Sequence, residues 1–117
     1  MRSQFTIATC ALLLVPISAP ASAAGQQYGV WGFGTQSCGT WTADKQKAGY
    51  EQIVDISWVE GYMSAMDRTN PAINVASHHT DANGMAAWVD NYCAAHPIEQ
   101  ISAAAEAFAA ELLSRPK

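Results

Sequence analysis

The sequence predicts an all-α protein, a small bundle of three to four helices stapled by one disulfide, with an irregular N-terminal arm rich in glycine and aromatic residues. Apolar residues recur at helical spacing in three stretches, near residues 42–68, 81–96 and 97–115. No stretch alternates apolar and polar residues as a half-buried strand would. We therefore expect an irregular arm over residues 24–40 and one helical domain over residues 41–117.

The first 23 residues are typical of a cleavable signal peptide. Arg2 supplies the positive charge, residues 5–17 form the apolar stretch, and Ala21-Ser22-Ala23 is a small-x-small cleavage site. About a dozen apolar residues are too few to cross a bilayer, which needs about 20. The sequence therefore predicts export and a mature chain that begins near Ala24.

Cysteine usage predicts one disulfide. Cys10 would be removed with the signal peptide, which leaves Cys38 and Cys93. Because a pair of cysteines in an exported chain is usually oxidised, we expect these two residues to form a bridge. They lie far apart in the sequence and do not form a C-x-x-C redox motif.

Charge excludes two classes of partner. The formal net charge is −4, and loss of Arg2 with the leader would make it −5. No basic patch occurs, so nucleic acid and anionic membranes are not expected partners. No second long apolar run follows the leader, so we expect no membrane insertion after its removal.

The arm contains Tyr28, Trp31 and Phe33 among closely spaced glycines. Glycine at this density disfavours a regular element, so we expect an irregular segment whose aromatic side chains could fold back on the helices. A phosphate-binding loop would need a strand before it and a helix after it, and this context is absent from the sequence pattern.

The first long helix is expected to start near Thr42, with Thr40 or Thr42 as its cap, and to end near Arg68. Gly49 marks a place where a shorter preceding helix could end, and Gly61 suggests close approach of another helix. The expected inner positions form two stripes, Tyr50, Val54, Trp58, Gly61 and Ala65, and Ile53, Ile56, Val59 and Met63. The expected outer positions are Glu51, Asp55, Glu60, Ser64 and Asp67.

Two further helices complete the prediction. Thr80 or Asp81 caps the second helix, and Pro97 is the expected first residue of the third. The inner positions of the second helix are Met85, Trp88, Val89, Tyr92 and Cys93. Those of the third are Ile98, Ile101, Ala105, Phe108 and Leu112, with Glu99, Gln100, Ser102, Glu106 and Glu111 outside.

No residue pattern points to an enzyme, a cofactor or a metal. His78 and His79 stand next to each other before Asp81, in what reads as a surface loop, and adjacent histidines do not share a helix face. No nucleophile elbow frames the serines. The residues expected to form the core or contact a partner are aromatic: Trp41, Trp58, Tyr62, Trp88 and Tyr92.

Several short motifs resemble those of the HdeA/HdeB-like small periplasmic proteins of Gram-negative bacteria. They are Ser37-Cys38-Gly39-Thr40-Trp41, the segment from Trp58 to Ser64, Asp81, and the segment from Trp88 to Pro97 that contains Tyr92-Cys93. The resemblance covers roughly residues 37–113. It implies a periplasmic helical domain with one disulfide, folded as an inactive dimer near neutral pH. It also implies an acid-stress chaperone that binds unfolding envelope proteins at low pH.

The chain departs from those chaperones in its alanine-rich C-terminal region, which lacks their lysines, and in its Gly-aromatic arm. Its layout is also similar to that of Tai-type immunity proteins, which neutralise secreted amidase effectors. That resemblance implies one cognate protein partner, bound by a preformed surface at neutral pH. A third interpretation is an accessory interaction protein of the periplasm with neither activity.

Overall fold

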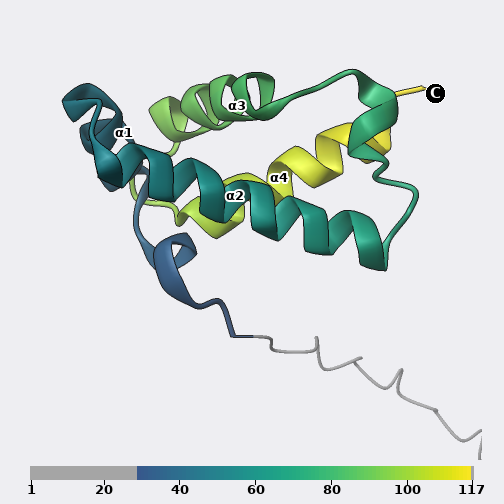
Figure 1. Cartoon of the computed structure of the whole chain (residues 1–117), viewed down its shortest axis with the longest axis horizontal. Coiled ribbons are helices and arrows are strands. Elements are labelled where there is room, and N and C mark those ends of the chain that lie inside the picture. Colours follow the sequence, from purple (N-terminus) through teal and green to yellow (C-terminus); the bar gives the residue numbers. More distant parts are fainter. Residues whose placement is uncertain (1–28, 117) are drawn as a thin grey trace, which may run out of the picture.

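The computed structural model describes residues 29–116, and the predicted signal peptide lies outside these residues. The elements, in chain order, are the 3₁₀ helix η1 (Gly32–Thr35), α1 (Cys38–Lys47), α2 (Tyr50–Thr69), the 3₁₀ helix η2 (Val75–His78), α3 (Ala82–Ala95) and α4 (Ile101–Ser114). Helix α1 packs against α2 and α3, and α4 packs against the same two helices (Figure 1). The predicted all-α bundle is confirmed, with four α-helices among the described residues.

Helix α1 begins four residues earlier than expected. Its cap is Ser37, whose hydroxyl accepts a hydrogen bond from the Thr40 backbone N–H at 3.2 Å. The prediction of Thr40 or Thr42 as the cap is therefore wrong, because both residues lie inside the helix. The Thr42 hydroxyl instead donates to the Cys38 carbonyl at 3.1 Å.

The break between α1 and α2 falls where Gly49 indicated it. Ala48 adopts a left-handed conformation with φ of 50°, and its N–H donates to the carbonyls of Asp44 and Lys45. Such a left-handed residue is a common helix end. Gly49 then precedes the first residue of α2 in an extended conformation.

One side of α2 that the prediction placed inside is exposed, and it includes Gly61 and Ala65. Tyr50 and Ile53 are 76% and 62% exposed, whereas Asp55 is buried at 1% exposure and leads the stripe that continues through Val59 and Met63. Apolar residues surround most of this helix, so their spacing alone does not fix its rotation, and the packing against α1 and α4 decides it. A Cβ added at Gly61 would meet no other element within 4 Å, so the expected close approach of a helix there is wrong.

Helix α3 follows the prediction closely. Asp81 is its cap and accepts from the Gly84 N–H at 2.8 Å. Met85, Val89 and Cys93 are buried, as expected from their spacing. The linker before α3, predicted as a surface loop, also contributes to the core, because Ile73 in it is only 1% exposed.

The segment from Pro97 to Gln100 is not helical, so α4 begins at Ile101. Its backbone pairs with the start of α1: the Cys38 N–H donates to the Glu99 carbonyl at 2.8 Å, and the Ile101 N–H donates to the Gln36 carbonyl at 2.9 Å. This long-range pairing overrides the local signal at Pro97. It leaves Ile98 91% exposed, although the prediction placed it inside, and Ser102 is buried although the prediction placed it outside.

The core is one cluster around the bridge between Cys38 and Cys93, which has an S–S distance of 2.04 Å. The predicted disulfide is confirmed. The other fully buried apolar members of this cluster come from α2, α3, α4 and the linker: Val59, Met63, Ile73, Val89, Ile101, Ala104, Ala105 and Leu112. The bridge therefore ties the start of α1 to the end of α3.

Candidate functional site: an aromatic groove on α2

A groove of about 430 Å³ lies between the N-terminal arm and α2. Gly29, Val30 and Trp31 line it from the arm. Ser57, Trp58, Gly61 and Tyr62 line it from α2. We call this feature the aromatic groove. Two of the predicted aromatic residues, Trp58 and Tyr62, belong to it.

The arm is fixed on α2 by one indole ring. The Trp58 Nε1–H donates to the Trp31 carbonyl at 2.9 Å. Gly34 is buried against the same ring, and a Cβ at this position would lie 2.0 Å from Trp58 Cζ2. Gly32 has a φ of 74°, which favours glycine. Gly34 therefore leaves the space that Trp58 occupies, and Gly32 provides the positive φ of the arm; the sequence analysis missed both roles when it interpreted the segment as irregular.

The groove wall on α2 is also tied to α4. The rings of Trp58 and Tyr62 stack with centroids 4.9 Å apart and planes 20° apart. The Tyr62 hydroxyl donates to Glu106 Oε1 of α4 at 3.0 Å. Offset stacking of this kind favours a fixed relative orientation of the two rings. The groove is thus built before any ligand arrives.

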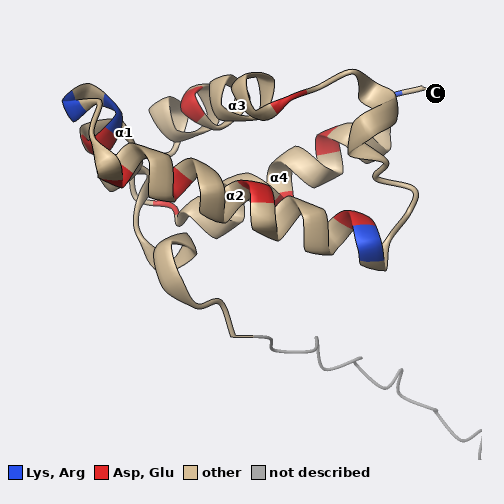
Figure 2. Cartoon of the chain, viewed as in Figure 1, with Lys and Arg blue, Asp and Glu red and all other residues tan. Residues whose placement is uncertain are grey.

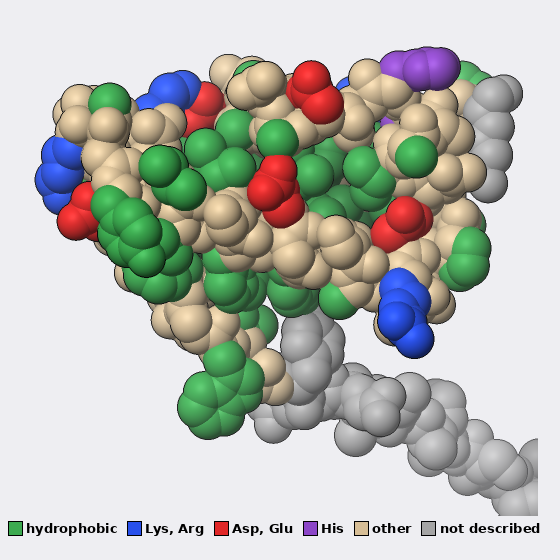
Figure 3. Space-filling view, in the orientation of Figure 1, with side chains coloured by type: hydrophobic (Ala, Val, Ile, Leu, Met, Phe, Trp, Pro, Cys, Tyr) green, Lys and Arg blue, Asp and Glu red, His purple; other side chains and the backbone are tan. Residues whose placement is uncertain are grey.

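An exposed apolar face continues from the groove along α2. Trp31 is 84% exposed, although its carbonyl is held by Trp58. Tyr50 and Ile53 are exposed two to three turns before Gly61 on the same side of α2. Figure 3 shows hydrophobic side chains gathered over the junction of α1 and α2 and over the arm. We call the exposed positions Tyr50, Ile53, Ser57, Gly61 and Ala65 the outer face of α2.

The residues that line the groove are uncharged, and the domain around them has a net negative charge. Residues 29–116 contain ten Asp and Glu against four Lys and Arg, and acidic residues occur along all four helices in Figure 2. Three of the four basic residues in this part of the chain form ion pairs, Lys45 with Asp90, Lys47 with Asp44 and Arg115 with Glu111. No Lys or Arg is among the residues that line the groove.

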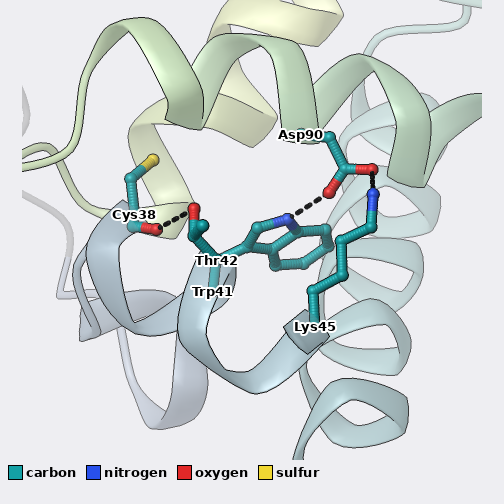
Figure 4. Close-up of polar contacts among 5 residues, drawn as sticks. All are labelled: Cys38, Trp41, Thr42, Lys45 and Asp90. Atoms are coloured by element: carbon teal, nitrogen blue, oxygen red, sulfur yellow. Dashed lines mark hydrogen bonds and ion pairs between the residues drawn. The ribbon is translucent and has the colours of Figure 1, made fainter. Parts of the chain in front are cut away.

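A polar cluster outside the groove lining joins α1 to α3. The Trp41 Nε1–H donates to Asp90 Oδ1 at 2.8 Å, and Lys45 pairs with the other oxygen of the same carboxylate (Figure 4). Trp41 is 4% exposed, so its ring belongs to the core while its N–H has a partner. This cluster holds the two helices that the disulfide also joins.

Asp55 is the one polar side chain of α2 that points fully into the protein. It is 1% exposed, and neither carboxylate oxygen has a hydrogen-bond partner within residues 29–116. Burial, joined by the negative charges of Asp44 and Glu51, raises the pKa of Asp55 from 3.8 to about 6. The prediction that Asp55 lies on the outer side of the helix is wrong. A charged residue ordinarily indicates an exposed position, so the sequence contained no sign of its burial.

Replacing Asp55 with Asn should stabilise the fold at pH 7 by on the order of 1–2 kcal/mol, because it removes a buried charge but leaves an unpaired amide in its place. The folded pKa of Asp55 lies above its unfolded value. Its contribution to stability is therefore fully present below about pH 4 and is lost as pH rises through about 6. Urea unfolding between pH 4 and 7 should show wild-type stability falling across this window, with a flatter profile for Asp55→Asn. Asp67→Asn, on the same helix, is the matched control, and equal profiles for the Asp55 variant and wild type would contradict the assignment.

Of the remaining predicted aromatic residues, Trp88 and Tyr92 pack against the core. Trp88 packs against Phe108 with centroids 5.2 Å apart and stacks on Tyr92 at 5.7 Å. Both Trp88 and Tyr92 are partly buried, and Tyr92 also contacts His96 at 4.5 Å. The structure thus separates the five predicted residues into Trp58 and Tyr62 at the groove and Trp41, Trp88 and Tyr92, which lie in the core or pack against it.

Within residues 29–116, no group of three or more His, Cys, Asp or Glu side chains is placed to hold a metal ion. In the same part of the chain, no helix has the length and apolar character needed to cross a membrane. Comparison with protein-family models, with curated proteins and with solved structures finds no match to this chain. Fold and site together define a small disulfide-bonded all-α domain with a preformed aromatic groove.

Proposed function

We propose that this chain is a non-enzymatic protein of the periplasm that binds another protein through the aromatic groove at neutral pH. The observation that supports this is Trp31, whose side chain is 84% exposed while its main chain is fixed on α2. An exposed tryptophan held in this way suits a protein contact, because aromatic residues beside a pocket carry much of the binding energy of interfaces. The disulfide is consistent with an oxidising compartment.

This proposal corresponds to the dedicated binding role that the resemblance to Tai-type immunity proteins implies. A preformed surface needs no acid to expose it. A photo-crosslinking residue at Ser57, which lines the groove, should therefore capture one protein in the producing cells at neutral pH. The same residue at Gln46, exposed on α1, is the control and should not capture that protein. Absence of a Ser57-specific adduct at neutral pH would contradict the proposal.

Acid-stress chaperone activity is the second candidate, and the cluster at Asp90 favours it. Asp90 joins α3 to α1 through its ion pair with Lys45 and the hydrogen bond that Trp41 donates to it, and carboxylate contacts of this kind are lost well below the reference pKa of about 4 for carboxyl groups. Loss of these contacts would loosen α1 from α3 while the disulfide limits the expansion. As pH falls toward about 4, protonation of Asp55 stabilises the folded state. Loosening of α1 from α3 is therefore expected only in stronger acid.

Light scattering from an acid-sensitive enzyme distinguishes the two candidates. The chaperone role predicts suppression of aggregation near pH 2–3, well below the reference pKa of about 4 for carboxyl groups, and none at neutral pH. It also predicts a reversible loss of the near-UV signal from the tryptophans at the same pH. Aggregation that proceeds unchanged in acid, with a rigid fold, would remove this candidate.

A further inference from the structure

We propose that the aromatic groove and the outer face of α2 bind a cationic amphipathic segment of a partner protein. Such a segment would place apolar side chains against α2 and Lys or Arg side chains toward the acidic flanks. This inference rests on the proposed function, which assigns the groove to protein binding, and it names the chemistry of the partner.

The shape of the surface suits a chain segment laid along α2. Ser57 and Gly61 form its floor, and the space above Gly61 is open, because a Cβ added there would meet no other element within 4 Å. Trp31 forms a wall on the side of the arm, and Ile53 extends the apolar surface one turn toward the helix start. Small residues on a helix let a second chain approach closely, and the neighbouring apolar residues then bury its side chains.

The charge of the surroundings selects a basic partner. Glu51 and Glu60 lie on α2 beside the outer face, and Glu106 of α4 accepts the hydrogen bond from Tyr62, which lines the groove. The lining of the groove contains neither acidic nor basic residues, and the exposed Arg68 follows Gly61 by two turns on the same side of α2. Lys and Arg also gain from the faces of tryptophan rings, which attract cations. The acidic residues beside the outer face and the exposed indole ring of Trp31 therefore both favour a Lys or Arg side chain of the partner.

The same charges disfavour a second copy of this chain as the occupant. Residues 29–116 carry an excess of acidic residues, and two copies joined through α2 would bring Glu60 and its symmetry mate to the same interface. Like charges at an interface oppose association. A partner with the opposite charge meets no such penalty.

Fluorescence anisotropy with two labelled amphipathic peptides tests the inference on the oxidised protein. The peptides have the same leucines, with lysine in one and glutamate in the other. The lysine peptide should bind at pH 7 and weaken as salt is raised, because ion pairing at a surface is screened. The glutamate peptide should not bind.

Two variants locate the site. Trp31→Ala should weaken binding of the lysine peptide by roughly tenfold or more. Gly61→Lys should do the same by filling the floor and adding a positive charge, and the open space there leaves the fold intact. Ile98→Ala is the matched control, because Ile98 is exposed outside the groove lining, and binding should be unchanged.

The outcomes separate this inference from the proposed function. If the glutamate peptide binds as well as the lysine peptide and Trp31→Ala weakens both, the groove is a protein site but its preference for cations is wrong. If neither peptide binds, or if both variants bind like wild type, the inference is overturned and the groove loses its support as the site. A dimer in solution that Gly61→Lys dissociates would assign the face to a second copy and overturn the inference as well.

Discussion

Replacing Cys93 with Ser should lower the free energy of unfolding by about 4 kcal/mol, the largest single effect expected in this protein. The bridge closes a loop with a sequence separation of 55 residues, and the chain-entropy treatment of such a loop gives this magnitude. Cys38 and Cys93 are 0% and 1% exposed, so the serine hydroxyl would also be buried in an apolar cluster. Denaturant unfolding of the oxidised wild type and the variant measures the difference.

The double substitution Cys38→Ala and Cys93→Ala separates the two causes. It removes the bridge without leaving a free thiol or a buried hydroxyl, so its difference from Cys93→Ser reports these polar groups together with the packing of the lost sulfur atoms. A variant that unfolds at the same denaturant concentration as the oxidised wild type would contradict the structural role of the bridge. Because the bridge joins α1 to α3, its loss should also weaken the near-UV signal of Trp41 and Trp88, which lie on these two helices.

The sequence predicted those parts of the fold in which the apolar residues at helical spacing are the ones buried in the core. Met85, Val89 and Cys93 on α3, and Ile101, Ala105 and Phe108 on α4, are buried as their spacing indicates. A narrow apolar stripe leaves only one rotation of a helix that buries it. The disulfide was predictable for a different reason, because the expected signal peptide leaves two cysteines and no choice of partner.

The predictions were wrong where contacts between residues far apart in the sequence determine the rotation or the start of a helix. Tyr50, Ile53 and Asp55 differ from the prediction because α2 carries apolar residues around most of its surface, and packing against α1 and α4 selects its rotation. Pro97 is a good first residue of a helix, but the backbone of residues 97–101 pairs with residues 36–39, which local sequence cannot show. Burial of Asp55 is likewise a property of the assembled bundle.

The groove was only half predictable. Trp58 and Tyr62 were identified as aromatic residues for the core or a partner, and the structure places them together with Trp31. Their relation to the arm depends on Gly32 and Gly34, which the sequence analysis treated as a reason for irregularity. The available signal was the regular interleaving of glycine and aromatic residues, which also fits a segment that packs closely on a large ring.

Gly34→Ala should destabilise the protein by about 1–3 kcal/mol and dismantle the groove, because the added methyl overlaps a packed ring. A Cβ on Gly34 would lie 2.0 Å from Cζ2 and 2.1 Å from Cη2 of Trp58. The indole cannot move aside freely, since its Nε1–H is bound to the Trp31 carbonyl and its face is stacked on Tyr62. Thermal unfolding and the near-UV signal of the tryptophans measure the two effects.

Gly61→Ala is the matched control, with the opposite sign. Gly61 lies inside α2 with open space around it, so alanine there should stabilise the helix by about 0.5–1 kcal/mol. The cause of the Gly34 effect can then be tested in a Trp58→Ala background, where the ring is gone. If the overlap with Trp58 is the cause, Gly34→Ala should be nearly neutral there, and full additivity of the two substitutions would contradict the seating of the arm on this ring.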